Sequence, residues 1–143
     1  MNRIVVGVDS SADAQRALRW ALDEAALRGV ELQLVHSYPT PELTALPAVV
    51  TLPSDEELRY AAEEILDEAL AAAGGAGEVT VSKTVRAGGA AAVLTEVAEG
   101  ADLMVVGARG LGGFRGLLLG SVTHQVVAHS PCPVVVVVPE KRH

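Results

Sequence analysis

The feature that most constrains the fold is a strict alternation of short, β-branched runs with segments whose apolar residues recur at helical spacing. The runs predict five strands, at residues 3–8, 31–37, 79–85, 102–107 and 133–138. The intervening segments predict four helices, at residues 13–28, 54–73, 89–100 and 121–129. Each return between parallel strands needs a crossover, so this order predicts an α/β fold: a five-stranded parallel sheet with four helices on both faces.

Local signals mark where two of these helices begin and end. The sequence SDEE places Ser54 three residues before Glu57, which is the capping-box pattern of a helix start. Gly29 follows the first helical segment, and glycine is common just after the last turn of a helix. Both signals agree with the alternation.

Length and composition limit the classes of protein that remain. The 143 residues suffice for one domain with a real core, so we expect a single domain over residues 1–143. A net charge of −7 and 3% aromatic residues argue against nucleic-acid binding. No apolar stretch approaches the roughly 18 residues that cross a bilayer, and the start of the chain has no signal-peptide pattern. We therefore expect no membrane association and a cytoplasmic location.

The stretch GARGLGGFRGLLLGS, residues 107–121, combines six glycines with two arginines and no acidic residue. It leaves the carboxyl end of a predicted strand and enters a predicted helix. Ligands of open α/β sheets bind at such ends, and glycines let main-chain N–H groups approach and converge on an anion. The helix N-terminus adds positive potential. The stretch therefore predicts a phosphate cradle, with Arg109 favoured for direct contact and Arg115 favoured as a solvated charge.

The glycine spacing is neither that of a P-loop, which needs a lysine, nor the dinucleotide fingerprint, which follows the first strand. The pattern G-x-x-G-x9-G-S over residues 107–121 instead resembles the ATP-binding branch of the universal stress protein family. Three further stretches carry the resemblance: IVVGVDSS at the start, LVHS at the end of the second strand, and SPCPVVVVV near the C-terminus. The likeness covers essentially the whole chain.

The resemblance implies a Rossmann-like sheet of strand order 3-2-1-4-5, similar to that of the adenine nucleotide alpha hydrolases. It implies ATP as the ligand, accompanied by Mg²⁺. Asp9 would meet the ribose or the metal, Gly7 would line the same edge, and main-chain groups of Ser37 would meet the adenine. The residues implied to lie on the phosphates are Gly107, Ala108, Arg109, Gly110, Gly112, Gly113, Gly120, Ser121 and Val122.

Simpler roles stay open for several of these residues. Asp9 suits a helix N-cap or a turn, and Ser121 suits the N-cap of the last helix. The glycine stretch suits a connecting loop without a ligand. Replacing Gly110 by a β-branched residue is expected to abolish nucleotide binding while the fold survives.

Three functions compete at this point. The first is a regulatory module that binds ATP and reports it to a protein partner, without catalysis. The second is a slow ATP-hydrolysing enzyme, and the third is a nucleotide-free structural dimer. An apolar strand at Val134–Val138 is expected at the sheet edge, where pairing with an identical copy would make a homodimer. The resemblance implies the same dimer.

Overall fold

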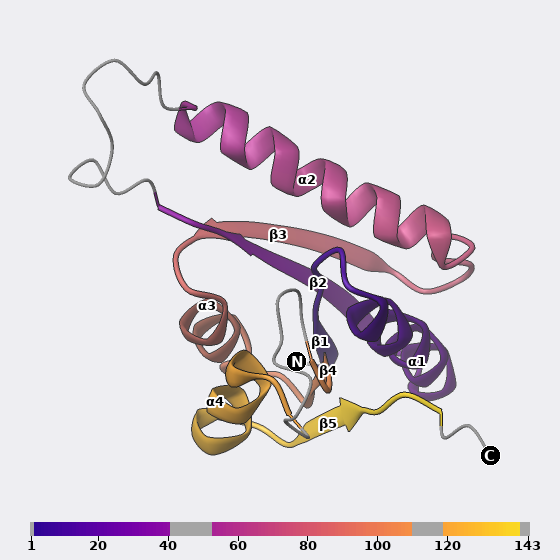
Figure 1. The fold of residues 1–143 in the computed structure, drawn as a ribbon. Coiled ribbons are helices and arrows are strands. Elements are labelled where there is room, and N and C mark those ends of the chain that lie inside the picture. The colour runs from indigo at the N-terminus through magenta and orange to yellow at the C-terminus, as the bar shows by residue number, and fades with distance from the viewer. Residues whose placement is uncertain (1, 41–52, 110–118, 141–143) are drawn as a thin grey trace.

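The computed structural model describes residues 2–40, 53–109 and 119–140 (Figure 1). Within them the elements alternate as β1 (Arg3–Gly7), α1 (Ala12–Arg28), β2 (Glu31–Tyr38), α2 (Asp55–Ala72), β3 (Val81–Ala87), α3 (Ala90–Val97), β4 (Leu103–Gly107), α4 (Ser121–His129) and β5 (Val134–Val137). All pairings between neighbouring strands are parallel, and the sheet order is β3-β2-β1-β4-β5. The predicted Rossmann-like fold is confirmed.

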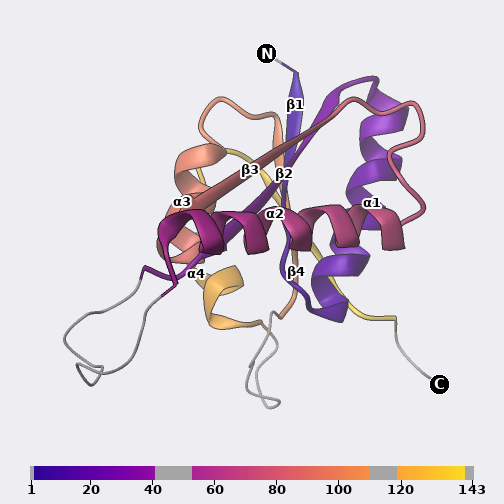
Figure 2. The same ribbon diagram turned by 90° about the horizontal axis from the view of Figure 1, so that it is seen from above.

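The four helices divide into two layers. Helices α1 and α2 pack on one face of the sheet, with Leu18 and Leu66 in the same cluster as Ile4 and Val6. Helices α3 and α4 pack on the other face, around Val5 and Met104 and their neighbours. The view from above shows α2 lying across β2 and β3 (Figure 2). Strands covered on both faces are expected to be apolar throughout, which explains the uninterrupted runs of β1 and β4.

The predicted helix signals are largely confirmed. The Ser54 hydroxyl accepts the Glu57 N–H at 3.1 Å, as a capping box requires. Gly29 ends α1 in the left-handed conformation, with φ of 66°.

The third strand begins two residues later than predicted, because the Val79 N–H donates to the Ala76 carbonyl in a turn before β3 starts.

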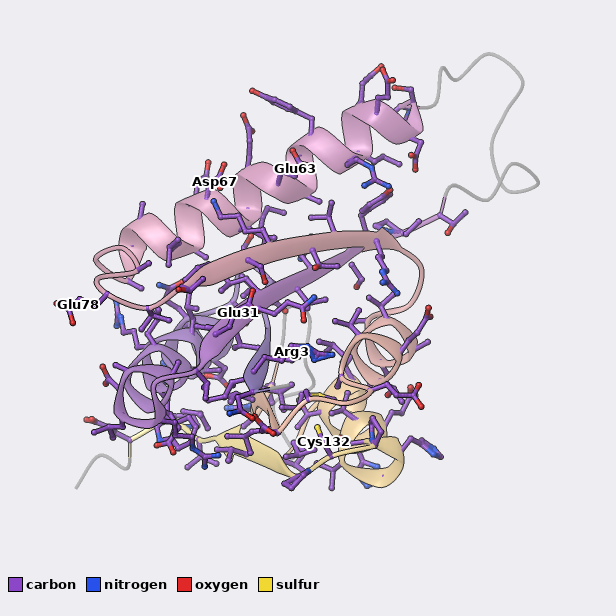
Figure 3. The ribbon with its side chains drawn as sticks, turned by 180° about the vertical axis from the view of Figure 1, so that it is seen from behind. Arg3, Glu31, Glu63, Asp67, Glu78 and Cys132 are labelled. Carbon is purple, nitrogen blue, oxygen red and sulfur yellow. The ribbon has the colours of Figure 1, made fainter. Side chains whose placement is uncertain are left out.

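The side chain of Arg3 links β1 to α3, two elements that are far apart in the sequence. The Arg3 side chain reaches from β1 to the end of α3 (Figure 3). Its Nη2 donates to the carbonyls of Val97 at 2.9 Å and Glu99 at 2.8 Å. These carbonyls lie at the C-terminal end of a helix, where no further helical N–H follows and a positive charge is favoured.

None of the helices in the described ranges is long and apolar enough to cross a lipid bilayer.

Candidate functional site

The candidate site lies where β1 and β4 end side by side. The two strands are paired in register, with Val6 opposite Val105. After β1 the chain turns into α1 on one face of the sheet, and after β4 it continues to α4 on the other face. The crossovers therefore diverge at this edge. In open α/β sheets such a divergence leaves a crevice beyond the carboxyl ends of the strands.

Asp9 follows β1 at this edge and organises the turn into α1. Its Oδ1 accepts the Ser11 N–H at 2.7 Å, and the Ser11 hydroxyl in turn accepts the Ala14 N–H at 3.1 Å. Ser11, not Asp9, is the N-cap of α1. Of the simpler roles considered for Asp9, the turn is confirmed and the cap is wrong. The ribose and metal roles stay predictions.

Gly107 ends β4 directly against the first turn of α1. A Cβ atom at Gly107 would lie 2.6 Å from the carbonyl carbon and 2.7 Å from the carbonyl oxygen of Asp13. Gly7 has a looser constraint, since its Cβ would lie 3.1 Å from the Leu94 side chain. Glycine is therefore required at 107 by packing within the chain. This is a reason that the sequence pattern did not reveal, because it depends on a neighbour distant in sequence.

The two ends of the glycine stretch are held together by hydrogen bonds. The Gly120 N–H donates to the Ala108 carbonyl at 2.7 Å, and the Ala108 N–H donates to the Val137 carbonyl at 3.1 Å. The buried Thr123 hydroxyl donates to the Gly107 carbonyl at 2.7 Å. The two described ends of the stretch therefore lie side by side next to β5. Gly110, Gly112 and Gly113, also predicted to meet phosphates, lie outside the described residues, as does Arg115.

Thr123 and Asp13 are two site residues that the sequence analysis did not identify. Thr123 had a usable signal, since it is a polar residue three positions before the buried Val126 on the same helix. Asp13 gave the signal of an ordinary acidic residue in the first turn of a helix. Its Oδ2 accepts the N–H of Arg109 at 3.1 Å, while its Oδ1 pairs with Arg16 at 2.9 Å.

The start of α4 differs from one of the predicted alternatives. Gly120 is the N-cap, without a side-chain hydrogen bond, and Ser121 is the first helical residue. The expectation that Ser121 caps the helix is therefore wrong, and its hydroxyl has no part in the cap. Ser121 is exposed, and the exposed fraction of Val122 is 38%. Both lie next to the closed ends of the glycine stretch.

The end of β2 borders the same edge. Val8 N–H donates to the Val35 carbonyl at 2.8 Å, so the ladder between β1 and β2 continues to this point. The His36 Nδ1 lies 2.7 Å from the Val8 carbonyl. A carbonyl only accepts, so the His36 Nδ1 is the donor in this contact. Ser37 follows, half-buried and opposite Arg86 of β3.

Beyond Ser37, Tyr38 ties the last residue of β2 to the first turn of α2. Its phenol donates to Asp55 Oδ1 at 2.9 Å. This bond to a carboxylate raises the pKa of Tyr38 above 10.0, and burial and the negative charge of Asp55 add to the rise. Arg59 acts in the opposite direction. The phenol is thus held neutral as a donor.

Other surfaces of the described residues do not coincide with this edge. A groove of about 660 Å³ lies between α3 and α4, and its lining includes Thr95, Glu96, Gln125 and His129, none of them predicted site residues. Within residues 2–40, 53–109 and 119–140, no three His, Cys, Asp or Glu side chains group as metal ligands would.

A protein-family model covers nearly the whole chain. The model of the universal stress protein family matches residues 1–138. The chain belongs to the universal stress protein family. It is 37% identical over 139 residues to a universal stress protein of Mycobacterium tuberculosis, covering 94% of this chain and 46% of that protein. A protein of the same name from Mycolicibacterium smegmatis is 34% identical, with 94% and 47% covered. The chain thus spans about half the length of these curated relatives.

Solved structures of similar chains include two nucleotide complexes. A universal stress protein in complex with cAMP is 30% identical, with a TM-score of 0.71 and coverage of 97% of this chain and 98% of that chain. The universal stress protein from Archaeoglobus fulgidus in complex with dAMP is 27% identical, with a TM-score of 0.70 and coverage of 96% and 98%. A third structure, from Lactobacillus plantarum, has 23% identity, a TM-score of 0.75 and coverage of 95% and 97%, and supports the fold alone.

Proposed function

We propose that this chain binds an adenine nucleotide at the edge where β1 and β4 end. One observation carries the proposal: the Gly120 N–H donates to the Ala108 carbonyl at 2.7 Å, so the two described ends of the glycine stretch meet where the crossovers diverge. The universal stress proteins solved with cAMP and dAMP, both adenine nucleotides, support this ligand class.

The residues at this edge suit distinct parts of ATP. The main-chain amides of Ser121 and Val122 in the first turn of α4, together with the Ser121 hydroxyl, would donate to phosphate oxygens. The amides of Ala108, Arg109 and Gly120 already donate within the chain. Asp9, which follows β1, would meet the ribose, and main-chain groups of Ser37 in β2 would meet the adenine.

Asp9 also fits a magnesium ion brought in with the triphosphate. One of its carboxylate oxygens, Oδ1, is engaged by the Ser11 N–H, and a carboxylate has a second oxygen to offer. Mg²⁺ is commonly bound by one or two carboxylates together with substrate phosphates. Bound there, the ion would neutralise part of the phosphate charge.

We infer a regulatory binding module for the stress response rather than an enzyme. Hydrolysis needs a group that orients the attacking water and groups that stabilise the developing charge. Both oxygens of Asp13 already accept hydrogen bonds, from the Arg109 N–H and from Arg16. Asp9 Oδ1 accepts the Ser11 N–H, and its other oxygen is the one proposed for Mg²⁺, so neither carboxylate is left to orient a water. A protein partner would then read the nucleotide-bound state. Sustained multiple turnover of Mg·ATP, measured as released phosphate, would contradict this inference.

We also infer that the module forms a homodimer through β5. This strand is at the sheet edge and pairs with β4 on one side. Next to it, Val138 is 63% exposed. An apolar edge strand favours pairing with another chain, and a two-fold axis would let an identical copy supply it.

The nucleotide proposal is tested by denaturing freshly purified protein and identifying the released small molecules. A stoichiometric adenine nucleotide is the expected result. The protein freed of nucleotide should then bind ATP in calorimetry.

Ser121→Ala is expected to weaken ATP binding several-fold without lowering the thermal midpoint, because its hydroxyl makes no capping bond. Gln125→Ala, one turn further along α4, is the control. A protein that neither releases nor binds an adenine nucleotide would instead support the structural dimer.

A further inference from the structure

Asp13 connects α1 to the glycine stretch through a chain of charged and polar contacts. Its side chain is only 12% exposed. One oxygen accepts the Arg109 N–H at 3.1 Å, and the other accepts from Arg16 Nη2 at 2.9 Å. The backbone of Asp13 is the part of α1 that lies against Gly107. The carboxylate is therefore held at the entrance of the proposed phosphate cradle.

A carboxylate at this place has the same chemistry as the ligand that the cradle would take. A main-chain N–H is a single donor, so the Arg109 amide that bonds to Asp13 is not available to a phosphate oxygen. Negative charge on a largely buried carboxylate is screened less than at the surface, so it also repels an approaching polyanion. Arg16 offsets part of this charge.

We propose that Asp13 is an internal anion that competes with the phosphate chain for the entrance of the glycine stretch and thereby sets the affinity for nucleotides by their charge. The proposal rests on the proposed nucleotide site. It assigns Asp13 a specificity role: adenosine gains nothing from displacing the carboxylate, whereas each added phosphate meets its charge. Arg16 is then the counter-cation that moderates this penalty.

Two substitutions of opposite expected effect separate this role from a structural one. Asp13→Asn keeps an oxygen that can accept the Arg109 N–H, but removes the negative charge and releases Arg16 from its ion pair. Both changes favour phosphate binding. Arg16→Gln removes the cation and leaves the Asp13 charge uncompensated, which disfavours phosphate binding. Neither change touches groups proposed to contact the adenine or the ribose.

The experiment measures dissociation constants of ATP and adenosine by calorimetry at one ionic strength, for the full chain and each variant. We expect Asp13→Asn to raise the affinity for ATP relative to adenosine about tenfold, and Arg16→Gln to lower it several-fold. Asp13→Glu, which keeps the charge, should leave the ratio close to that of the unmodified protein. Asp23→Asn is the matched control, since it makes the same charge change at an exposed position further along α1.

An unchanged or lowered ATP-to-adenosine ratio in Asp13→Asn would overturn the proposal and leave Asp13 as a purely structural link. If Asp13→Asn fails to fold, an unchanged ratio in Arg16→Gln overturns it equally. A protein that binds neither ATP nor adenosine before any substitution contradicts the nucleotide site itself, which is a different failure.

Discussion

Gly107 lies so close to the backbone of α1 that a single methyl group has no room. The atoms it would meet belong to the main chain of Asp13, which cannot rotate away. We expect Gly107→Ala to lower the free energy of unfolding by about 3 kcal/mol, because the strand and the helix must separate to admit the Cβ. Urea unfolding followed by circular dichroism measures the loss.

Gly89→Ala is the control for that substitution. A Cβ at Gly89 meets nothing within 4 Å, and the residue is the N-cap of α3 with an ordinary φ of −71°. Its cost should stay below about 1 kcal/mol. Equal losses in the two variants would show that close packing is not the reason for glycine at 107.

Tyr38 makes the stability depend on pH in the alkaline range. Its pKa is raised in the folded chain, so the stabilisation is fully present below the unfolded value of 10.0 and is lost as the pH rises through the folded pKa. We expect Tyr38→Phe to be less stable than the unmodified protein near neutral pH, and the difference to shrink above about pH 10. Urea midpoints over this pH range measure it. A constant difference would rule out the hydrogen bond to Asp55 as its source.

At the scale of elements, α4 is attached to β4 by the hydroxyl of Thr123. This hydroxyl is buried and donates to the Gly107 carbonyl at 2.7 Å. Thr123→Val keeps the shape but leaves that carbonyl without this donor, so we expect a loss of about 1–3 kcal/mol in the free energy of unfolding. The loosened start of α4 should also weaken ATP binding.

Thr95→Val provides the comparison within α3. Its hydroxyl donates at 2.8 Å to the Ala91 carbonyl, four residues earlier in the same helix, so it joins no separate elements. We expect this variant to lose less stability than Thr123→Val. Its affinity for ATP should stay unchanged. The reverse order would mean that the bond between α4 and β4 is not what stabilises the site.

At the scale of the whole molecule, we expect self-association to depend on the edge strand β5 and on Val138, which follows it. Val138 is 63% exposed in the single chain, so Val138→Lys should cost the monomer little. In a dimer paired along β5 it would add a positive charge from each copy to the apolar edge, and we expect the dissociation constant of the dimer to rise at least tenfold. Light scattering after size-exclusion chromatography measures the mass. A monomeric mass for the unmodified chain at micromolar concentration would contradict the dimer.

The sequence predicted the fold closely because its signals are local. Alternating strand and helix patterns, the capping box at Ser54 and the stop at Gly29 depend on residues within a few positions of each other. The strand order followed from the family resemblance, and the sheet confirmed it. The site was predicted in part: Asp9 and both described ends of the glycine stretch meet at one edge, and their contacts with a nucleotide stay predictions.

By itself, the sequence determined the layered α/β fold and the order of its elements, and it predicted the edge for a ligand. Only the tertiary structure decided why Gly107 must be glycine, that Thr123 joins α4 to β4, and that the Asp13 carboxylate engages the Arg109 amide. The physical reason is sequence separation. Asp13 and Arg109 are 96 positions apart, and no local pattern records a contact that exists only once the sheet has brought β1 and β4 together.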